Sequence, residues 1–233
     1  MAGSPSPSQT LSRGLRALEI LAAAPEPLSI AELADALAVH RSIAYRILRT
    51  LEDHSLVVRD GGGRLRPGPG LAVLAHGVSR DLQAAAMPEL TVVSTELGMT
   101  AFVALWQGSE CVTLVSVEPR HGGPALAQRP GTRHPVSRGA PGIAVQSTMT
   151  ARRWCELEPD LPYRPDAAIA AALGYATSHD EVITGVSSVA VPLRFPHEPV
   201  AALAVVYIRS DRDPAGIAAV LAAAARRIEQ SGT

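Results

Sequence analysis

The sequence predicts an α+β protein in two parts: a small helical part that ends in a β-hairpin, and a larger part built on an antiparallel sheet. Up to about residue 51, apolar residues recur every three to four positions, which is the period of amphipathic helices. Beyond residue 98, apolar runs of about eight residues are paired across turn residues, which is typical of hairpins. The chain has 233 residues, of which 47% are hydrophobic, so it can fill more than one core.

The first predicted helix covers Gln9 to Ala24. It is followed by Pro25 and Pro27, which stop a helix because proline lacks the N–H that would continue it. Residues 1–8, MAGSPSPS, lack the apolar run of a signal peptide, so we expect a flexible tail. The apolar positions of the helix are Leu11, Leu15, Leu18, Leu21 and Ala22.

A second helix is predicted after Ser29, because Glu32 follows three residues later and completes a capping box. Only residues 38–40 separate it from the stretch HRSIAYRILRTL, residues 40–51, which also has helical periodicity. Two short helices joined by so tight a turn predict a helix-turn-helix, in which the second helix is the recognition helix. The inward positions of the first of these two helices are Ile30, Leu33, Ala34 and Leu37.

The predicted recognition helix has two different faces. Guanidinium groups, a hydroxyl and a phenol on its outer face are groups that read guanine edges and bind phosphates in a DNA major groove. An exposed helix face with arginines is more often only a solvated surface, so the helix alone does not decide between these interpretations. The apolar face consists of Ala44, Ile47, Leu48 and Leu51, and the outer face includes Ser42, Tyr45, Arg46 and Arg49.

The segment that follows favours DNA binding. In SLVVRDGGGRLRPG, residues 55–68, two extended runs flank an Asp-Gly turn, which is a strong hairpin signal and predicts a β-wing. Residues 40–66 hold six arginines against three acidic residues, a local charge of +3 in a chain of net charge -1. Arg59, Arg64 and Arg66 lie on or near the wing, where they can reach phosphates or an adjacent minor groove.

Composition excludes several classes of protein. All 21 basic residues are arginine, which removes P-loop and Schiff-base lysines. The two cysteines, Cys111 and Cys155, are too few for a disulfide framework or a zinc cluster. No apolar run reaches transmembrane length without a charge or a proline, so we expect a soluble, cytoplasmic protein.

The remaining elements are predicted from the same signals. Residues 70–86 predict a linker helix, Pro88 resets the chain, and a helix over Glu89–Leu97 ends at Gly98. A Pro/Gly-rich loop over 119–131 leads to an extended stretch at His134–Val136 and to a helix from about Gly142. Two hairpins and a final helix complete the sheet part: strands 100–107 with 111–118, strands 187–195 with 200–208, and a helix from Pro214 to about Gln230.

From about Gln9 to its end, the chain resembles the IclR family, the isocitrate-lyase-regulator type of bacterial transcription factor. The resemblance rests on the order of several motifs over two domains, because none of them is diagnostic alone. The strongest is VHRSIAYRILRTL, which is similar to the family pattern L-P-K-S-T-V-x-R-L-L-x-T-L. The others are RLRPGPGLAVLA, RHPVSRGAPGIA, GYATSHDEVITGVSSVAVPL and AALAVVYI.

The resemblance implies a winged helix-turn-helix regulator with a GAF-like effector domain. The implied parts are a flexible tail (1–8), a DNA-binding domain (9–69), a linker helix (70–86) and an effector-binding domain (87–233). Such proteins dimerise through the DNA-binding and linker region, often pair again into tetramers, and respond to small organic acids or aromatic metabolites. The implied partners are therefore operator DNA and a small-molecule effector, and no cofactor is expected.

The DNA face carries over by position from the family motif. The matching residues include Ile43, which stands where the family usually has threonine, so one hydroxyl contact is lost or replaced by contact with a thymine methyl. The implied DNA-binding residues are Arg41, Ser42, Ile43, Tyr45, Arg46, Arg49, Arg59, Arg64 and Arg66.

The implied effector site departs more from the family. Where relatives hold a carboxylate with two backbone amides matching Ala140 and Pro141, Pro141 has no N–H to give. Ser178 and Ser188 replace an aspartate and a cysteine, and Ile143 replaces the usual lysine. Because a carboxylate would be under-satisfied here, we expect an aromatic or weakly polar effector, or a regulator that has lost small-molecule sensing. The effector residues implied by the resemblance are Ala140, Pro141, Ser178, Ser188, Ala204 and Val206, the last two in place of serines. Phe102 is added as an effector-site candidate because of its aromatic ring.

Two alternatives concern single residues. Phe102 and Trp106 fall on one strand face and can line a pocket, although core packing or a dimer interface is the more usual role for such residues. An enzyme is not expected, because no nucleophile elbow, metal-ligand spacing or phosphate loop accompanies the histidines. Those histidines are His134, His179 and His197, which lie near Ser137 or Ser187.

Overall fold

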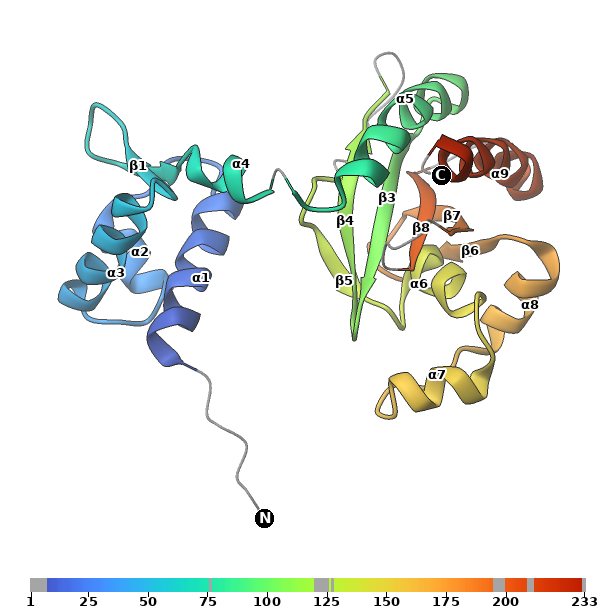
Figure 1. The fold of residues 1–233 in the computed structure, drawn as a ribbon, viewed down its shortest axis with the longest axis horizontal. Helices are drawn as coiled ribbons and strands as arrows, with labels where there is room; N and C mark the ends of the chain where they lie inside the picture. The colour runs from blue at the N-terminus through green and yellow to red at the C-terminus, as the bar shows by residue number, and fades with distance from the viewer. Residues whose placement is uncertain are drawn as a thin grey trace. The chain divides into compact units, whose positions relative to one another are not determined.

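The computed structural model describes residues 8–75, 77–119, 126, 128–194, 200–208 and 212–231. It divides into two compact units, Met1–Val78 and Ser79–Thr233, drawn in Figure 1. The expected α+β class is confirmed, with a helical N-terminal unit and a sheet-based second unit. The predicted tail, apart from Ser8, and the connection over 196–199 lie outside the described residues.

The N-terminal unit has the predicted order of helices followed by a hairpin. The hairpin strands pair in an antiparallel register that sets Arg59 opposite Leu65. The hairpin is also joined to the loop before the second helix, because Leu28 and Leu65 exchange backbone hydrogen bonds of 3.1 and 2.7 Å. The elements are α1 (Gln9–Ala23), α2 (Ile30–Ala36), α3 (Arg41–Asp53), β1 (Val57–Arg59), β2 (Leu65–Pro67) and α4 (Gly70–Ala75).

Local capping and a small core fix the helix-turn-helix. The predicted capping box is present: the Ser29 amide donates to the Glu32 carboxylate at 2.7 Å, and the Glu32 amide donates to the Ser29 hydroxyl at 3.2 Å. Between α2 and α3, Ala38 adopts a positive φ of 52°, which makes the turn tight. The buried core joins α1, α2 and α3 to the hairpin and consists of Ala17, Leu21, Leu33, Ile47, Leu48, Leu51, Val57 and Leu65.

The predicted single helix over residues 70–86 is wrong. The structure has the short helix α4, a break that includes Ser79 at a positive φ of 43°, and a long helix α5 (Arg80–Leu97). Pro88 does not interrupt α5, although its ring removes one helical hydrogen bond. Packing outweighs that loss, because α5 buries an apolar stripe at helical spacing: Leu82, Ala86, Leu90, Val93 and Leu97.

The second unit is organised around one six-stranded antiparallel sheet with the order β5-β4-β3-β8-β7-β6. Both predicted hairpins are confirmed, and the pairing of β3 with β8 joins them. The edge strand β6 was not predicted, because ATSH has no apolar alternation to announce it. The strands are β3 (Thr100–Gln107), β4 (Glu110–Val117), β5 (Arg133–Pro135), β6 (Ala176–His179), β7 (Ser187–Leu193) and β8 (Ala201–Tyr207).

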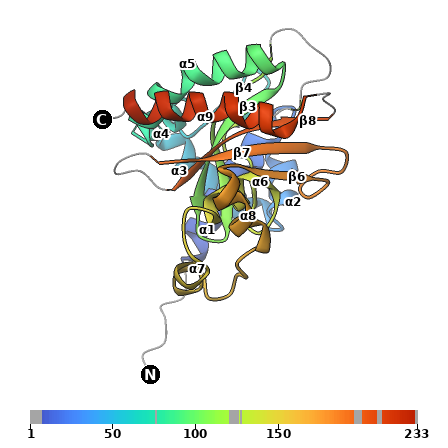
Figure 2. The ribbon, with the colours of Figure 1, turned by 90° about the vertical axis from the view of Figure 1, so that its right-hand side faces the viewer.

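Helices cover both faces of this sheet, as Figure 2 shows. The helices α5 and α9 (Pro214–Ser231) lie side by side on one face, against residues such as Val103 and Leu203. The opposite face carries Phe102 and packs against α6 (Gly139–Gln146), and α8 (Pro165–Leu173) lies beyond α6. Small residues on that face let α6 approach so closely that all its residues are buried; they include Ala104, Ala190, Ala202 and Ala204.

The helix predicted from about Gly142 begins three residues earlier, at Gly139. Gly139 has a φ of +83°, which turns the chain into α6 and favours glycine. Gly142 packs against the backbone of Val136, where a Cβ atom would overlap the carbonyl oxygen. Pro141 fits because it lies in the first turn, where a missing N–H breaks no helical hydrogen bond.

The segment between α6 and β6 contains two helices that were not predicted, α7 (Ala151–Leu157) and α8. Both are short, with seven and nine residues, so their periodicity is weak. Helix α7 buries Trp154, whose ring centre lies 5.4 Å from that of Trp106. Trp106 therefore packs against a core tryptophan and does not line the pocket described below.

Candidate nucleic-acid interface and ligand pocket

The helix α3 has the two faces that its sequence predicts. Ala44 and Leu48 are fully buried, whereas Tyr45 on the opposite face is 55% exposed. Arg46 and Arg49 lie on the same exposed face as Tyr45. The core thus fixes the rotation of α3 about its axis, and its polar face is turned to solvent.

The arginines of α3 carry charge that no ion pair with a described residue neutralises. Within the described residues, Arg41, Arg46 and Arg49 form no ion pair. The Ser42 hydroxyl, in contrast, already lies 2.8 Å from Nδ1 of His40, the residue that caps α3. Ile43 is 37% exposed next to them and adds an apolar contact surface.

The wing arginines differ from one another. Arg59 forms an ion pair with Glu52 of α3 at 2.6 Å, and this hydrogen bond raises the pKa of the Arg59 guanidinium. Arg64 donates to the carbonyl oxygen of Pro27 at 2.7 Å and lies 3.7 Å from the Glu32 carboxylate. Arg66 is exposed and forms no ion pair with the part of the chain that the structure describes. Two of the three wing arginines that are predicted to contact DNA are therefore already hydrogen-bonded within the fold.

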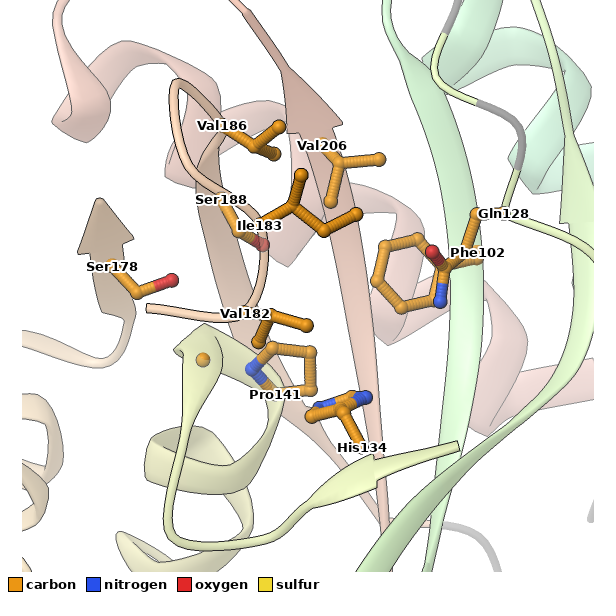
Figure 3. Close-up of a pocket in the computed structure, with 11 residues that line it drawn as sticks. Phe102, Gln128, His134, Pro141, Ser178, Val182, Ile183, Val186, Ser188 and Val206 are labelled. Atoms are coloured by element: carbon orange, nitrogen blue, oxygen red, sulfur yellow. The ribbon is translucent and has the colours of Figure 1, made fainter. Parts of the chain in front are cut away.

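The second unit has a pocket where the start of α6 meets the sheet and the loop over 180–186, shown in Figure 3. Its volume of about 40 Å³ holds a few water molecules, far less than the roughly 300 Å³ at which ligand pockets begin. Its lining is mainly apolar and comprises Phe102, Gln128, His134, Gly139, Pro141, Ser178, Val182, Ile183, Val186, Ser188 and Val206.

Five of the seven effector residues predicted from sequence line this pocket. Ala140 and Ala204 do not, because both side chains are fully buried against the rest of the core. Sequence reasoning missed the contribution of the loop over 180–186. Its signal is the apolar pair Val182 and Ile183, which interrupts an otherwise polar stretch and is 46% and 53% exposed.

Hydrogen bonds within the fold occupy most polar groups around the pocket. The Gly139 amide donates to the Glu181 carboxylate at 2.7 Å, and the Ala140 amide donates to the Ser178 hydroxyl at 2.9 Å. The Ser188 hydroxyl donates to the carbonyl oxygen of Val205 at 2.8 Å. His134 is the exception: its Nε2 atom is buried and has no hydrogen-bond partner among the described residues.

Burial and pairing shift several pKa values here. Burial lowers the pKa of His134, although Glu110 opposes this, so its imidazole is held in the neutral form. Burial alone would raise the pKa of Glu181, but hydrogen bonds from Arg164 and from the Gly139 amide outweigh it and lower the pKa. In the same buried cluster as Phe102, burial raises the pKa of the Cys111 thiol to about 12, which makes that thiol unreactive.

The histidines considered for catalysis lie in different places. His134 lines the pocket, and His197 is outside the described residues. On the surface, Nδ1 of His179 lies 2.9 Å from the Ser187 hydroxyl, and its Nε2 lies 3.2 Å from the Asp180 carboxylate. The described residues contain no group of three or more His, Cys, Asp or Glu that could hold a metal ion. Nor does any helix among them have the length and apolarity needed to cross a membrane.

A winged helix-turn-helix with an open basic face, followed by an α+β unit with an apolar pocket, defines a two-domain protein of the winged-helix class. Comparison with known proteins agrees, because residues 10–61 match the IclR helix-turn-helix domain. The HTH-type transcriptional regulator Rv1719 of Mycobacterium tuberculosis is 33% identical over 112 residues, 48% of this chain and 43% of that protein. The probable transcriptional regulator SauR of Cupriavidus necator is 30% identical over 160 residues, 67% of this chain and 63% of that protein.

The matched segments thus span less than two thirds of both curated relatives. Among solved structures, an IclR homolog from Microbacterium hydrocarbonoxydans in complex with 4-hydroxybenzoate shares the fold over the whole chain. Its TM-score is 0.80 at 22% identity, over 96% of this chain and 98% of that one. The N-terminal unit thus contains an IclR helix-turn-helix domain, and the chain shares its fold with solved structures of IclR homologues.

Proposed function

We propose that the protein binds operator DNA through α3 and the wing and regulates transcription, as a repressor controlled by a small organic effector. The observation that carries this proposal is the exposed face of α3, whose arginines have no ion-pair partner in the described residues and lie beside a wing. The proposed DNA contacts are Arg41, Ser42, Ile43, Tyr45, Arg46, Arg49, Arg59, Arg64 and Arg66.

The proposed contacts divide into two kinds. Arginine forks on α3 can bind O6 and N7 of guanine, and the exposed Ile43 can contact a thymine methyl. Wing arginines would bind phosphates, which fix orientation but do not specify sequence. Arg59 and Arg64 can do so only by sharing or leaving the partners they already have, so Arg66 is the best-placed of the three.

The DNA-binding region is also proposed to form the dimer. Its helices leave apolar side chains in solvent: Leu11 and Leu15 of α1 are 63% and 53% exposed, and Val73 and Leu74 of α4 are 74% and 66% exposed. Exposed apolar residues gathered on one part of a surface are typical of interaction surfaces. We propose a homodimer through this region, with a dimer of dimers as a further possibility, acting on nucleoid DNA in the cytoplasm.

The pocket of the second unit is the proposed effector site. The effector is proposed to be aromatic or weakly polar, since Phe102 and four branched aliphatic side chains line the pocket: Val182, Ile183, Val186 and Val206. The structural relative from Microbacterium hydrocarbonoxydans was solved with 4-hydroxybenzoate, whose aromatic ring supports an aromatic effector, although that compound also carries a carboxylate. The proposed division of roles is DNA binding by residues 9–69, linkage by 70–86 and effector binding by 87–233.

A second candidate function follows from the size of the pocket. At about 40 Å³ it has no room for a metabolite unless the loop over 180–186 moves. This observation favours a regulator that no longer senses a small molecule and responds to a protein partner or to its own abundance. Reproducible thermal stabilisation by one aromatic or aliphatic compound would exclude this second candidate.

The test of the proposed function is operator mapping followed by a salt titration. A footprint of the full-length protein on DNA upstream of its own gene should show a protected palindrome or near-palindrome, as two recognition helices require. The logarithm of the affinity should fall steeply with the logarithm of salt concentration, because arginine–phosphate contacts release counterions. A protein that binds all duplexes equally well, with no protected site, would contradict the proposal.

A further inference from the structure

The start of α6 offers no donor to a bound carboxylate. The first backbone amides of a helix have no partner within it and commonly bind anions. Here the Gly139 amide donates to Glu181 at 2.7 Å and the Ala140 amide donates to Ser178 at 2.9 Å. Pro141, the third residue, has no N–H. The chain itself occupies the amides that an anion would need.

Glu181 also places a negative charge beside the pocket. Its carboxylate accepts hydrogen bonds from both terminal nitrogens of Arg164, at 2.5 and 3.0 Å. The two side chains are only 25% and 19% exposed, so this pair is little screened by solvent. A second carboxylate at the start of α6 would meet the charge of Glu181 and find the guanidinium of Arg164 already paired.

His134, in contrast to Glu181, has a polar side-chain atom that forms no hydrogen bond with the described residues. The residue is 6% exposed, and its Nε2 has no hydrogen bond in the described part of the chain. The atom lies at the pocket wall, because a Cβ atom added to Gly139 would be 3.6 Å from it, and Figure 3 shows the ring beside Pro141 and Val182. A buried polar atom without a partner is unfavourable by roughly 1–3 kcal/mol, so a ligand group that pairs with it gains affinity.

The neutral imidazole selects the kind of group that can pair with it. Burial lowers the pKa of His134 and so favours the neutral ring, which has one N–H and one lone pair. A hydroxyl group can pair with Nε2 in either tautomer, because it both donates and accepts, and a carbonyl group can pair with Nε2 when that nitrogen carries the proton. A carboxylate would be left without a counter-charge. Each of the other polar side chains at the pocket has at least one hydrogen bond: Ser188 donates to Val205, the Gln128 amide donates to Thr113 at 2.8 Å, and the Ser178 hydroxyl accepts from the Ala140 amide.

A ligand can enter the pocket only where the side chains of its wall can move aside. Val182 and Ile183 of the loop over 180–186 point into the pocket in Figure 3, yet they are 46% and 53% exposed. Moving half-exposed side chains outward loses little buried apolar area, and an apolar ligand restores that area. The body of the ligand would then lie between these side chains and the ring of Phe102.

We propose that this pocket takes an uncharged molecule with an apolar body and one hydroxyl or carbonyl group, which binds Nε2 of His134, and that it rejects carboxylates. This inference rests on the proposed function, since it concerns the same effector site. It goes further by assigning the recognition atom and by excluding the carboxylate end of an acidic effector from the start of α6.

The test compares phenol with benzoate on the full-length protein, by calorimetric titration and by NMR of labelled histidine side chains. Phenol should shift the imidazole resonances of His134 and bind, whereas benzoate should bind at least about tenfold more weakly. In His134→Leu, which keeps an apolar side chain in the core, phenol affinity should fall about tenfold. Benzoate that binds the wild type as tightly as phenol would overturn the proposal, and so would the absence of any phenol shift at His134.

A gain-of-binding variant gives an independent arm. The double substitution Pro141→Ala and Ser178→Ala restores one N–H and frees a second, so benzoate affinity should rise about tenfold while the Glu181–Arg164 pair is kept. No gain of benzoate affinity in the folded double variant would contradict the assigned role of these amides. Operator binding is measured on the same samples: its absence in the wild type refutes the proposed function, whereas the ligand results alone decide the pocket assignment.

Discussion

The arginines of the wing differ in the contacts that they make within the fold. Arg66 is exposed, whereas the guanidinium of Arg64 donates a hydrogen bond to the Pro27 carbonyl oxygen at 2.7 Å. We therefore expect Arg66→Ala to weaken operator binding about three- to tenfold and to reduce the salt slope by about one. Arg64→Ala should weaken it less. Fluorescence anisotropy at several salt concentrations measures both, and a larger loss for Arg64→Ala would refute this ranking.

His134 predicts a pH dependence of stability. Its pKa lies below the ordinary value of 6.5 because of burial, so the unfolded chain binds more protons than the folded chain as the pH falls below 6.5. Its contribution to stability is therefore complete above pH 6.5 and is lost as the pH falls toward the folded pKa. Chemical denaturation between pH 7.5 and 5.5 should show a flatter profile for His134→Leu than for the wild type. Parallel profiles would mean that His134 titrates alike in both states.

At the scale of elements, α6 depends on a glycine that permits close packing. A Cβ atom at Gly142 would overlap the carbonyl oxygen of Val136, so Gly142→Ala should destabilise the second unit by about 1–3 kcal/mol or more. The matched control is Gly216→Ala in α9, where nothing lies within 4 Å of an added Cβ atom. That change should be neutral or stabilise by up to about 1 kcal/mol. Urea denaturation distinguishes them, and equal effects would contradict this packing argument.

Sequence patterns predicted some elements well because their determinants are local. The two faces of α3 follow from the spacing of Ala44, Ile47 and Leu48, and the capping box follows from Ser29 and Glu32. The prediction that the helix is interrupted at Pro88 is wrong. The apolar stripe of α5 packs on the sheet, and this tertiary packing outweighs the tendency of proline to break a helix. Strand β6 is likewise specified by its pairing with β7 rather than by its own residues.

The residues of the pocket likewise divide into those that sequence motifs predict and those that only the tertiary structure brings to the pocket. Pro141 and Val206 could be placed by resemblance to the family, since each lies in a motif that keeps its order, and Phe102 could be proposed from its aromatic side chain on a strand. The role of Val182 and Ile183 could not, because it depends on how the loop over 180–186 folds back onto α6. The hydrogen bond that the Gly139 amide donates to the Glu181 carboxylate joins residues 42 positions apart, and no local pattern encodes such a bond.

At the scale of the whole molecule, the proposed dimer is the next requirement, because palindromic operators need two recognition helices. Leu15→Glu combined with Val73→Glu places charges on apolar side chains that are 53% and 74% exposed. Sedimentation velocity should show a dimer for the wild type and a monomer for this double variant. The control Leu157→Glu, on the 40% exposed leucine of α7, should remain a dimer. A double variant that stays dimeric would place the interface elsewhere.

The central claim is that α3 presents the surface that reads DNA. Its most direct test is the affinity of the full-length protein for its mapped operator, with Arg46→Ala combined with Arg49→Ala against the control Arg226→Ala on the exposed face of α9. The double variant should lose about 100-fold or more in affinity, because each guanidinium contact contributes roughly 1–3 kcal/mol, and the control should bind like the wild type. A double variant that binds the operator as tightly as the control would contradict the claim.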